Sequence, residues 1–229
     1  IAVGKPFATS CMGLVSEGAH HACPDARIGV LGGPTSAHEV ANGLPTAITL
    51  ACEDAALASQ LAAHLARPHF RPYVSSDVIG AEIGGAVKNV LAIACGVVEG
   101  RGLGQNARSA LIARGFAEMT RFGLAKGART ETLAGLSGLG DLVLTCSSTA
   151  SRNFSLGKGL GEGKSAAELL AASRTVAEGA FTAPVLQQAA RALGVDMPVV
   201  DAVCGLLSGS LPVDQVVGGL LARPLRSES

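Results

Sequence analysis

Apolar and polar positions follow two different patterns along this chain. Short apolar runs at 28–31 and 46–50 lie next to glycine or proline, which predicts buried strands, and residues 71–74 predict one more strand. Helical spacing appears between and after them, at 36–42 and 54–65. Because strands and helices alternate, this part predicts a partly parallel α/β sheet. The apolar residues 1–4 predict a further strand, and with no initiating Met they suggest that the chain begins inside a longer protein.

From Val78 onward the pattern becomes helical. Over 78–98, apolar residues recur every three or four positions, which predicts a helix. Further helices are predicted at 105–125, 166–172, 180–193, 198–207 and 213–222. Residues 75–77 (Ser-Ser-Asp) offer N-cap chemistry for the first of these helices. In the second, Arg114 and Glu118 are four residues apart and predict a polar face. We therefore expect an α/β domain at 1–76 and an all-α domain at 77–229.

Composition narrows the class of protein. The 229 residues include 18 Lys+Arg and 18 Asp+Glu, a zero net charge that argues against binding nucleic acid or a membrane surface. Hydrophobic residues make up 48% and charged residues 16%, which predicts a large core. We find no run approaching the ~18 uncharged apolar residues of a membrane span and expect a soluble protein. The six cysteines lack zinc-site spacing, so we expect reduced core thiols, a cytosolic location and no metal site.

Lys88 is the first candidate for chemistry. It and Glu82 are the only charged residues in 78–98, and helical spacing puts Lys88 on the same side as Gly84 and Gly85. Small residues beside a solitary lysine leave room for a ligand. The alternative is a surface lysine whose aliphatic stem covers a mostly buried helix.

A second candidate follows the glycine-rich stretch 135–140, where Asp141, Thr145 and residues 151–153 (Ser-Arg-Asn) concentrate polar groups. Arginine offers a planar fork of donors to a phosphate, and Ser or Asn at a helix start helps present backbone N–H groups to the same anion. A capped loop with a surface arginine is the alternative, and spacing alone leaves both open. No G-x-G-x-x-G stands between a strand and a helix, and the P-loop, G-x-S-x-G and H-E-x-x-H motifs are absent from the sequence.

Residues 80–89, GAEIGGAVKN, resemble the signature of NAD(P)-dependent glycerol-3-phosphate dehydrogenases. Further segments agree with that family in the same order, namely GPT at 33–35, GLPT at 43–46, GLGDL at 138–142, SRN at 151–153 and VAEG at 176–179. The resemblance covers essentially the whole chain. It implies that the family's first βαβ unit, with its glycine-rich loop, is missing.

The fold implied by the resemblance is a Rossmann-type α/β remnant at 1–76 followed by an all-α domain at 77–229, of the 6-phosphogluconate-dehydrogenase-like C-terminal type. The implied activity is that of a cytoplasmic oxidoreductase that interconverts sn-glycerol 3-phosphate and dihydroxyacetone phosphate with NAD or NADP for phospholipid synthesis. A homodimer formed through the helical domain is also implied.

The resemblance further assigns roles to single residues. It makes Lys88 the catalytic residue, which donates and accepts the proton at the C2 oxygen of the substrate. The substrate contacts that it implies are Lys5, Gly33, Thr35, Lys88, Asp141, Ser151, Arg152 and Asn153, with Thr145 nearby. The cofactor contacts that it implies are Lys5, Ala37, Arg152, Val176 and Glu178. It implies no metal ligand.

Two other functions are compatible with the sequence. The chain could be a catalytically silent helical dimerisation or binding fragment of such an enzyme, or a related dehydrogenase for another hydroxy acid. The Ser-Arg-Asn segment, taken with Lys88, favours a phosphorylated substrate. The sequence leaves open NAD against NADP, reaction direction and oligomeric state.

Overall fold

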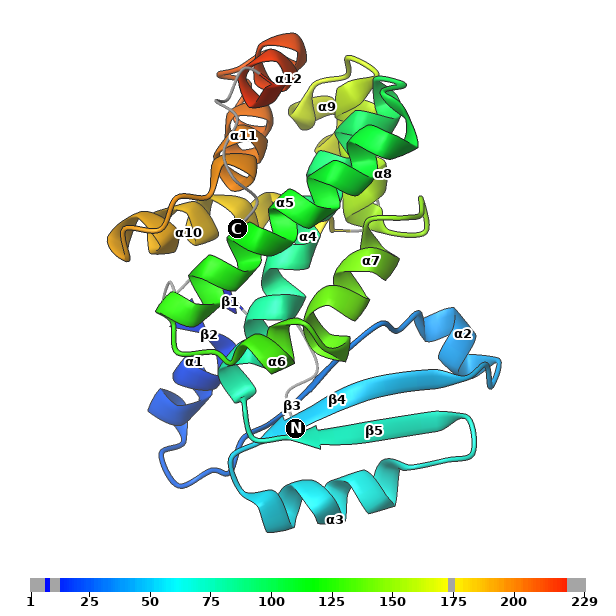
Figure 1. Ribbon diagram of the computed structural model, residues 1–229, viewed down its shortest axis with the longest axis vertical. Helices are drawn as coiled ribbons and strands as arrows, with labels where there is room; N and C mark the ends of the chain where they lie inside the picture. The colour runs from blue at the N-terminus through cyan, green and yellow to red at the C-terminus, as the bar shows by residue number, and fades with distance from the viewer. Residues whose placement is uncertain (1–6, 9–12, 173–175, 222–229) are drawn as a thin grey trace.

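The computed structural model describes residues 7–8, 13–172 and 176–221 (Figure 1). The first part of the chain contains β1 (Phe7–Ala8), β2 (Gly13–Leu14), α1 (Val15–Ala22), β3 (Gly29–Gly32), α2 (Ala37–Ala41), β4 (Thr46–Cys52), α3 (Ala55–Leu65) and β5 (Phe70–Ser75). The second part contains α4 (Val78–Gly100), α5 (Gly104–Ala125), α6 (Thr130–Leu133), the π-helical turn η1 (Leu136–Gly140), α7 (Asp141–Thr145), α8 (Arg152–Gly161), α9 (Ala166–Ala172), α10 (Glu178–Ala192), α11 (Pro198–Leu207) and α12 (Val213–Leu221).

Three strands of the first part form a sheet in the order β3-β4-β5. β3 runs antiparallel to β4, with Val30 opposite Ala51, and β4 runs parallel to β5, with Thr49 opposite Tyr73. α3 packs against β4 and β5 on one side of the sheet, and the helical part lies on the other side (Figure 1). The predicted partly parallel α/β unit is therefore confirmed.

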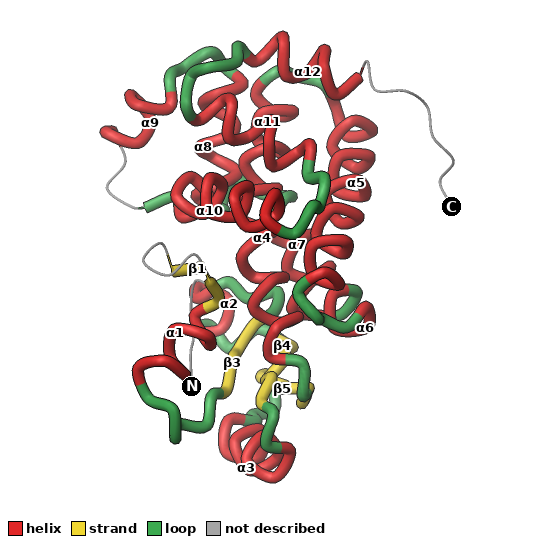
Figure 2. Tube along the Cα trace, turned by 90° about the vertical axis from the view of Figure 1, so that its left-hand side faces the viewer, coloured by secondary structure: helices red, strands yellow, loops and turns green. Residues whose placement is uncertain are grey.

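α4 is the central element of the helical part. It begins at its N-cap Asp77, where Oδ1 accepts a hydrogen bond of 2.8 Å from the backbone N–H of Gly80. Helices α5, α7, α8, α10 and α11 pack around it (Figure 2). Its apolar side chains join one core cluster with Phe122, Phe154 and Leu186. This arrangement confirms the all-α class predicted for the second part of the chain.

The predicted helices at 105–125, 166–172, 180–193, 198–207 and 213–222 correspond within two residues to α5, α9, α10, α11 and α12, with residue 222 outside the described part. The sequence does not predict α1, α6, η1, α7 or α8 as helices. The strand predicted at 1–4 also lies outside the described residues. The boundary at 76/77 remains a prediction.

By length and composition, α4 could cross a membrane, although Glu82 and Lys88 leave no run of ~18 uncharged apolar residues in it. It has 23 residues, with a mean hydropathy of 1.5 over the most apolar window. In the folded chain, 83% of that window is buried. The core helix of a folded domain has the same length and composition, because it is surrounded by other helices rather than by lipid.

Glycines of α4 and α8 allow their backbones to pack against each other. A Cβ atom built on Gly96 would lie 2.1 Å from the carbonyl oxygen of Phe154, and one built on Gly157 would lie 1.9 Å from that of Ile93. Both positions therefore require the absence of a side chain. Close packing also corrects the expectation that Gly84 leaves room for a ligand, because a Cβ there would lie 2.1 Å from the carbonyl oxygen of Ser137.

Two other expectations are wrong in part. Glu118 does not belong to a solvated polar face, because it is only 2% exposed and accepts a hydrogen bond of 2.8 Å from the backbone N–H of Val199. The cysteines are not all core residues. Cys52, Cys95 and Cys146 are buried, Cys204 is half-buried, Cys23 is exposed, and Cys11 lies outside the described residues.

Candidate active-site cleft

A cleft of about 700 Å³ lies where the end of β3 meets the helical part. β3 and the segment leading into α2 form one wall, and α4 forms another. Its lining residues are Val30, Leu31, Gly32, Gly33, Thr35, Ser36, Ala37, Glu39, Ala81, Glu82, Gly85, Lys88, Asn89, Asp141, Leu144, Thr145, Ser148, Ala150, Ser151, Arg152, Asn153 and Glu178.

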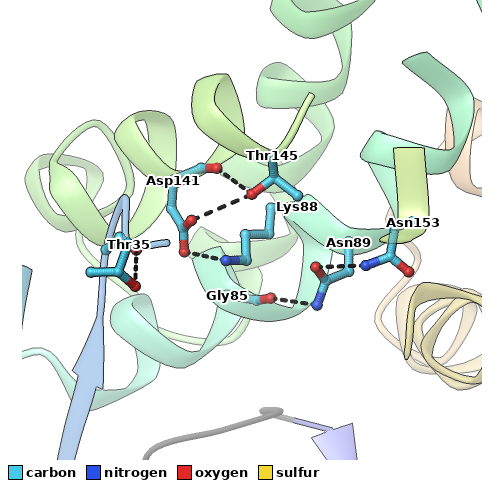
Figure 3. A network of polar contacts seen from close by, with 8 residues as sticks. Thr35, Gly85, Lys88, Asn89, Asp141, Thr145 and Asn153 are labelled. Carbon is cyan, nitrogen blue, oxygen red and sulfur yellow. Dashed lines mark hydrogen bonds and ion pairs between the residues drawn. The ribbon is translucent and has the colours of Figure 1, made fainter. Parts of the chain in front are cut away.

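Lys88 and Asp141 form an ion pair at the cleft, although 53 residues separate them in sequence. The Lys88 ammonium donates to Oδ2 of Asp141, and their side chains are 19% and 4% exposed (Figure 3). The Thr145 hydroxyl donates to the backbone carbonyl of Asp141 at 2.6 Å, one turn along α7. The lysine is thus held in a mostly water-excluded place, unlike a surface lysine.

The carboxyl group of Asp141 has a raised pKa because it is buried. The Lys88 ammonium, the Thr145 hydroxyl and the backbone N–H of Gly33 oppose this effect by stabilising the charged form. Gly33 directly follows β3 and belongs to the wall that β3 forms. Asp141 therefore interacts with both walls of the cleft.

The position of Asp141 depends on close backbone packing between α4 and η1. A Cβ atom on Gly84 would overlap the Ser137 carbonyl, and one on Gly138 would lie 1.8 Å from the carbonyl oxygen of Leu133. Because Gly84 carries no side chain, η1 lies directly against α4, and because Gly138 carries none, η1 also packs closely on the end of α6. Asp141 follows η1 as the first residue of α7. Single π-helical turns are frequent at functional sites.

An asparagine network joins α4, α8 and α10 beside this pair, and Figure 3 shows its part between α4 and α8. The amide of Asn153 donates to Oδ1 of Asn89 at 3.0 Å, and its own oxygen accepts from the backbone N–H of Gly179 at 2.8 Å. Asn89 in turn donates to the Gly85 carbonyl at 3.3 Å. Buried, mutually satisfied amides fix the relative positions of the three helices.

Arg152 lies at the start of α8, whose N-cap is Ser151. The Ser151 hydroxyl accepts a hydrogen bond from the backbone N–H of Phe154 at 3.3 Å. The Arg152 guanidinium is 53% exposed and donates to Glu178 at 3.0 Å, while the Glu178 side chain is 13% exposed. The first turn of α8 therefore presents a cation and a helix N-terminus to the cleft, which is favourable for an anion.

The cleft brings together most of the residues that the resemblance implies for the site: Gly33, Thr35, Ala37, Lys88, Asp141, Thr145, Ser151, Arg152, Asn153 and Glu178. Val176 is 54% exposed and is not among the lining residues. Lys5 lies outside the described residues.

The sequence assigned no role to five polar residues of the cleft, namely Ser36, Glu39, Glu82, Asn89 and Ser148. A signal was present for two of them. Glu82 and Asn89 belong to the same ten-residue segment as Lys88, and Glu82 is the second charge of a helix that is otherwise uncharged up to Val98. Within the described residues, no group of three or more His, Cys, Asp or Glu side chains is placed to hold a metal ion.

Solved structures resemble this fold closely. Glycerol-3-phosphate dehydrogenase from Coxiella burnetii matches with a TM-score of 0.92 at 40% sequence identity, over 96% of this chain and 67% of that one. The fold is therefore of the dehydrogenase class that joins a Rossmann-type part to a helical part. The model of the NAD-dependent glycerol-3-phosphate dehydrogenase C-terminus matches residues 77–218, and that of the N-terminus matches residues 1–58. The chain belongs to the NAD-dependent glycerol-3-phosphate dehydrogenase family.

Curated relatives agree with this membership. A protein from Sphingopyxis alaskensis is 70% identical over 87% of this chain, and one from Novosphingobium aromaticivorans is 68% identical over 94% of it. Both are named glycerol-3-phosphate dehydrogenase (NAD(P)+). The chain spans 60% and 66% of their respective lengths.

Proposed function

We propose that the cleft takes part in the interconversion of sn-glycerol 3-phosphate and dihydroxyacetone phosphate, with NAD or NADP as the redox cofactor. The observation that carries the proposal is the Lys88–Asp141 ion pair, largely buried in a cleft that also contains the first turn of α8. An ammonium next to an anion-binding helix start suits a substrate with a carbonyl and a phosphate. The names of the relatives support glycerol 3-phosphate as the substrate and NAD or NADP as the cofactor.

Each residue would have a distinct task. Lys88 holds a proton at the C2 oxygen and transfers it as alkoxide charge develops there during reduction. Asp141 keeps the lysine in place through the ion pair, and Thr145 stabilises the first turn of α7. Arg152, together with the start of α8, binds the phosphate through its guanidinium fork.

The cleft contains residues that could hold the part of a dinucleotide cofactor that lies beside the substrate. Arg152 and Glu178 supply a donor fork and a carboxylate at the cleft, and both are candidates to hold the cofactor beside the substrate, together with Ala37. The described part of the chain contains no strand followed by a G-x-G-x-x-G turn and a helix, the usual cradle of a pyrophosphate. When bound, the nicotinamide supplies or accepts the hydride.

The organisation of the protein is part of the same proposal. Residues 1–76 would form the cofactor-binding part and residues 77–229 the substrate-binding part, which can also associate as a homodimer. Lys5, Val176 and the other residues implied by the family resemblance remain candidates for substrate or cofactor contacts. From the same family resemblance we infer that the protein is a cytoplasmic enzyme of phospholipid precursor synthesis.

The test is oxidation of NADH and NADPH with dihydroxyacetone phosphate, run on this chain and on a version lengthened at the N-terminus to the size of the relatives. We expect Lys88→Ala in the active version to lower kcat by about 10²- to 10⁴-fold, as is typical for loss of general acid–base catalysis, and to spare cofactor binding. Lys158→Ala is the matched control, because this lysine is exposed on α8.

Retention of kcat in Lys88→Ala would remove Lys88 from the chemistry. Absence of activity in both lengths would favour the second function, a binding or dimerisation fragment without catalysis. Activity with another hydroxy acid, and none with dihydroxyacetone phosphate, would favour a related dehydrogenase. Activity of this chain without the extension would show that it binds the cofactor without the glycine-rich turn.

A further inference from the structure

Glu82 is a buried carboxylate in the cleft that the proposed chemistry does not use. It is 3% exposed and lies on α4, six residues before Lys88, which is about 9 Å along a helix axis. Burial raises the pKa of its carboxyl group, and the nearby Glu17 carboxylate adds to this effect. A buried acid is costly unless hydrogen bonds compensate for its lost hydration.

The hydrogen bonds described for this carboxylate come from one residue of the N-terminal part. The backbone N–H of Ser16 donates to Oε1 at 3.0 Å, and the Ser16 hydroxyl donates to Oε2. Ser16 lies in the first turn of α1, 66 residues before Glu82. The contact therefore joins the two parts of the chain that meet at the cleft.

Other contacts hold the same turn against the helical part. Leu14, the N-cap of α1, is completely buried and belongs to the same core cluster as Ile83 and Phe122. Glu17 accepts from the backbone N–H of Leu14 at 2.8 Å and from the ammonium of Lys126, at the end of α5, at 3.2 Å. Figure 2 shows α1 at the level where the sheet and the helical part meet.

We infer that Glu82 is a positioning residue of the cleft, whose carboxylate fixes the start of α1, through Ser16, to the part of α4 that lines the cleft. α1 leads into β3, which forms the opposite wall and ends at Gly32, with Gly33 directly after it. The anchor thus restricts how far the two walls can separate. Its effect on ligand binding rests on the proposed function, because it requires that the cleft binds glycerol phosphate.

Glutamine is the variant that separates anchoring from charge. Its side-chain oxygen can accept from the Ser16 N–H and its amide can donate to the Ser16 hydroxyl, so Glu82→Gln keeps both contacts without the negative charge. Glu82→Ala removes both contacts. Ser16→Ala removes the hydroxyl contact alone and leaves the buried helix α4 unchanged, so it remains informative if Glu82→Ala does not fold.

The first measurement is amide hydrogen exchange on the 229-residue chain. We expect exchange within residues 13–22 to accelerate about tenfold or more in Glu82→Ala, to change less in Ser16→Ala and to stay within about threefold in Glu82→Gln. Amides of α11 serve as the internal control. Unchanged exchange of residues 13–22 in both alanine variants would overturn the anchor, as would equal acceleration in the glutamine and alanine variants.

The second measurement is calorimetric titration of the same proteins with sn-glycerol 3-phosphate. We expect the affinity to fall by about threefold or more in Glu82→Ala and to be restored in Glu82→Gln, because an anchor and not a charge is required. Equal affinity in all variants, with faster exchange only in the alanine variants, would reduce Glu82 to a structural role. If the unsubstituted chain binds no glycerol phosphate, the proposed function loses support while the exchange result still decides whether Glu82 is an anchor.

Discussion

Arg152 is the side chain best placed to distinguish a phosphate from other anions. Its guanidinium already donates to Glu178 at 3.0 Å, so its fork is oriented before any ligand arrives. We expect Arg152→Lys to raise KM for dihydroxyacetone phosphate about tenfold and to change kcat less, because an ammonium cannot bind a phosphate in the bidentate manner. Steady-state kinetics on the active version measures both values. An unchanged KM would separate Arg152 from the phosphate.

Glu118 shows how burial changes a residue that the sequence places on a polar face. Its carboxylate lies at the start of α11, where the backbone N–H groups of Val199 and Val200 donate to it. Desolvation raises its pKa from 4.5 to about 7, although these donors and Arg121 oppose the shift and Asp196 adds to it. Between these two pH values, the folded protein binds a proton that the unfolded chain releases.

The sign of the resulting pH dependence follows from that proton. The contribution of Glu118 to stability is fully present below about pH 4.5 and is lost as the pH rises through about 7, by on the order of 3 kcal/mol. We expect the free energy of unfolding of the unsubstituted chain to fall by that amount relative to Glu118→Gln between pH 4.5 and 8. Urea unfolding at several pH values measures it, with the exposed Glu131→Gln as control. A pH-independent difference would contradict the raised pKa.

Among the helices, the pair α4 and α8 depends on glycine for its distance of approach. A Cβ atom on Gly96 would lie 2.1 Å from the Phe154 carbonyl oxygen and 2.7 Å from the Lys158 backbone nitrogen. Neither atom can move without displacing α8, whose first turn carries Arg152 and Asn153. The geometry of the cleft is therefore coupled to backbone packing between α4 and α8 further along α4.

We expect Gly96→Ala to lower the free energy of unfolding by about 1–3 kcal/mol or more, because the helices must separate to accept the methyl group. Gly218→Ala in α12 is the control. No atom lies within 4 Å of a Cβ built there, so alanine should raise stability by about 0.5–1 kcal/mol. Denaturant unfolding monitored by circular dichroism compares the two. Equal effects of both substitutions would contradict backbone contact between α4 and α8.

The two parts of the chain are not joined at residues 75–77 alone. Leu14 lies in the N-terminal part but is 0% exposed in the core of the helical part. Next to it, the backbone N–H of Ser16 donates to Oε1 of Glu82 on α4 at 3.0 Å. The predicted boundary at 76/77 therefore separates two patterns in the sequence, but side chains from before it pack into the core of the part after it.

We expect Leu14→Ala to lower the free energy of unfolding by about 2–5 kcal/mol, the usual cost of a cavity at a fully buried leucine. Helical signal in urea should report the loss, because the core that contains Leu14 is built from α4 and its neighbours. Leu44→Ala is the control, since Leu44 is 48% exposed. A loss confined to the sheet, with the helices melting as before, would contradict the placement of Leu14 in the helical core.

Local patterns in the sequence were sufficient to predict the position of most of the longer helices and of the sheet strands. The spacing of apolar residues and the caps Asp54 and Asp77 involve neighbours within a few positions, so α3 and α4 could be placed from the sequence. The short turns η1 and α7 could not, because glycine-rich segments have weak local preferences and these turns form by packing against α4. The ten residues around Lys88 carry a family resemblance that does not depend on the fold.

Contacts between distant residues were beyond the reach of the sequence. Three such contacts follow from the packing of α4 against other segments. Lys88 pairs with Asp141, Glu82 accepts from Ser16, and the space beside Gly84 is occupied by the backbone of η1 instead of being open to a ligand. Glu118 differs from its expected exposure for the same reason, because α11 begins over it. Periodicity is a property of neighbouring residues, whereas burial and pairing across 50 or more residues depend on which surfaces the folded chain brings together.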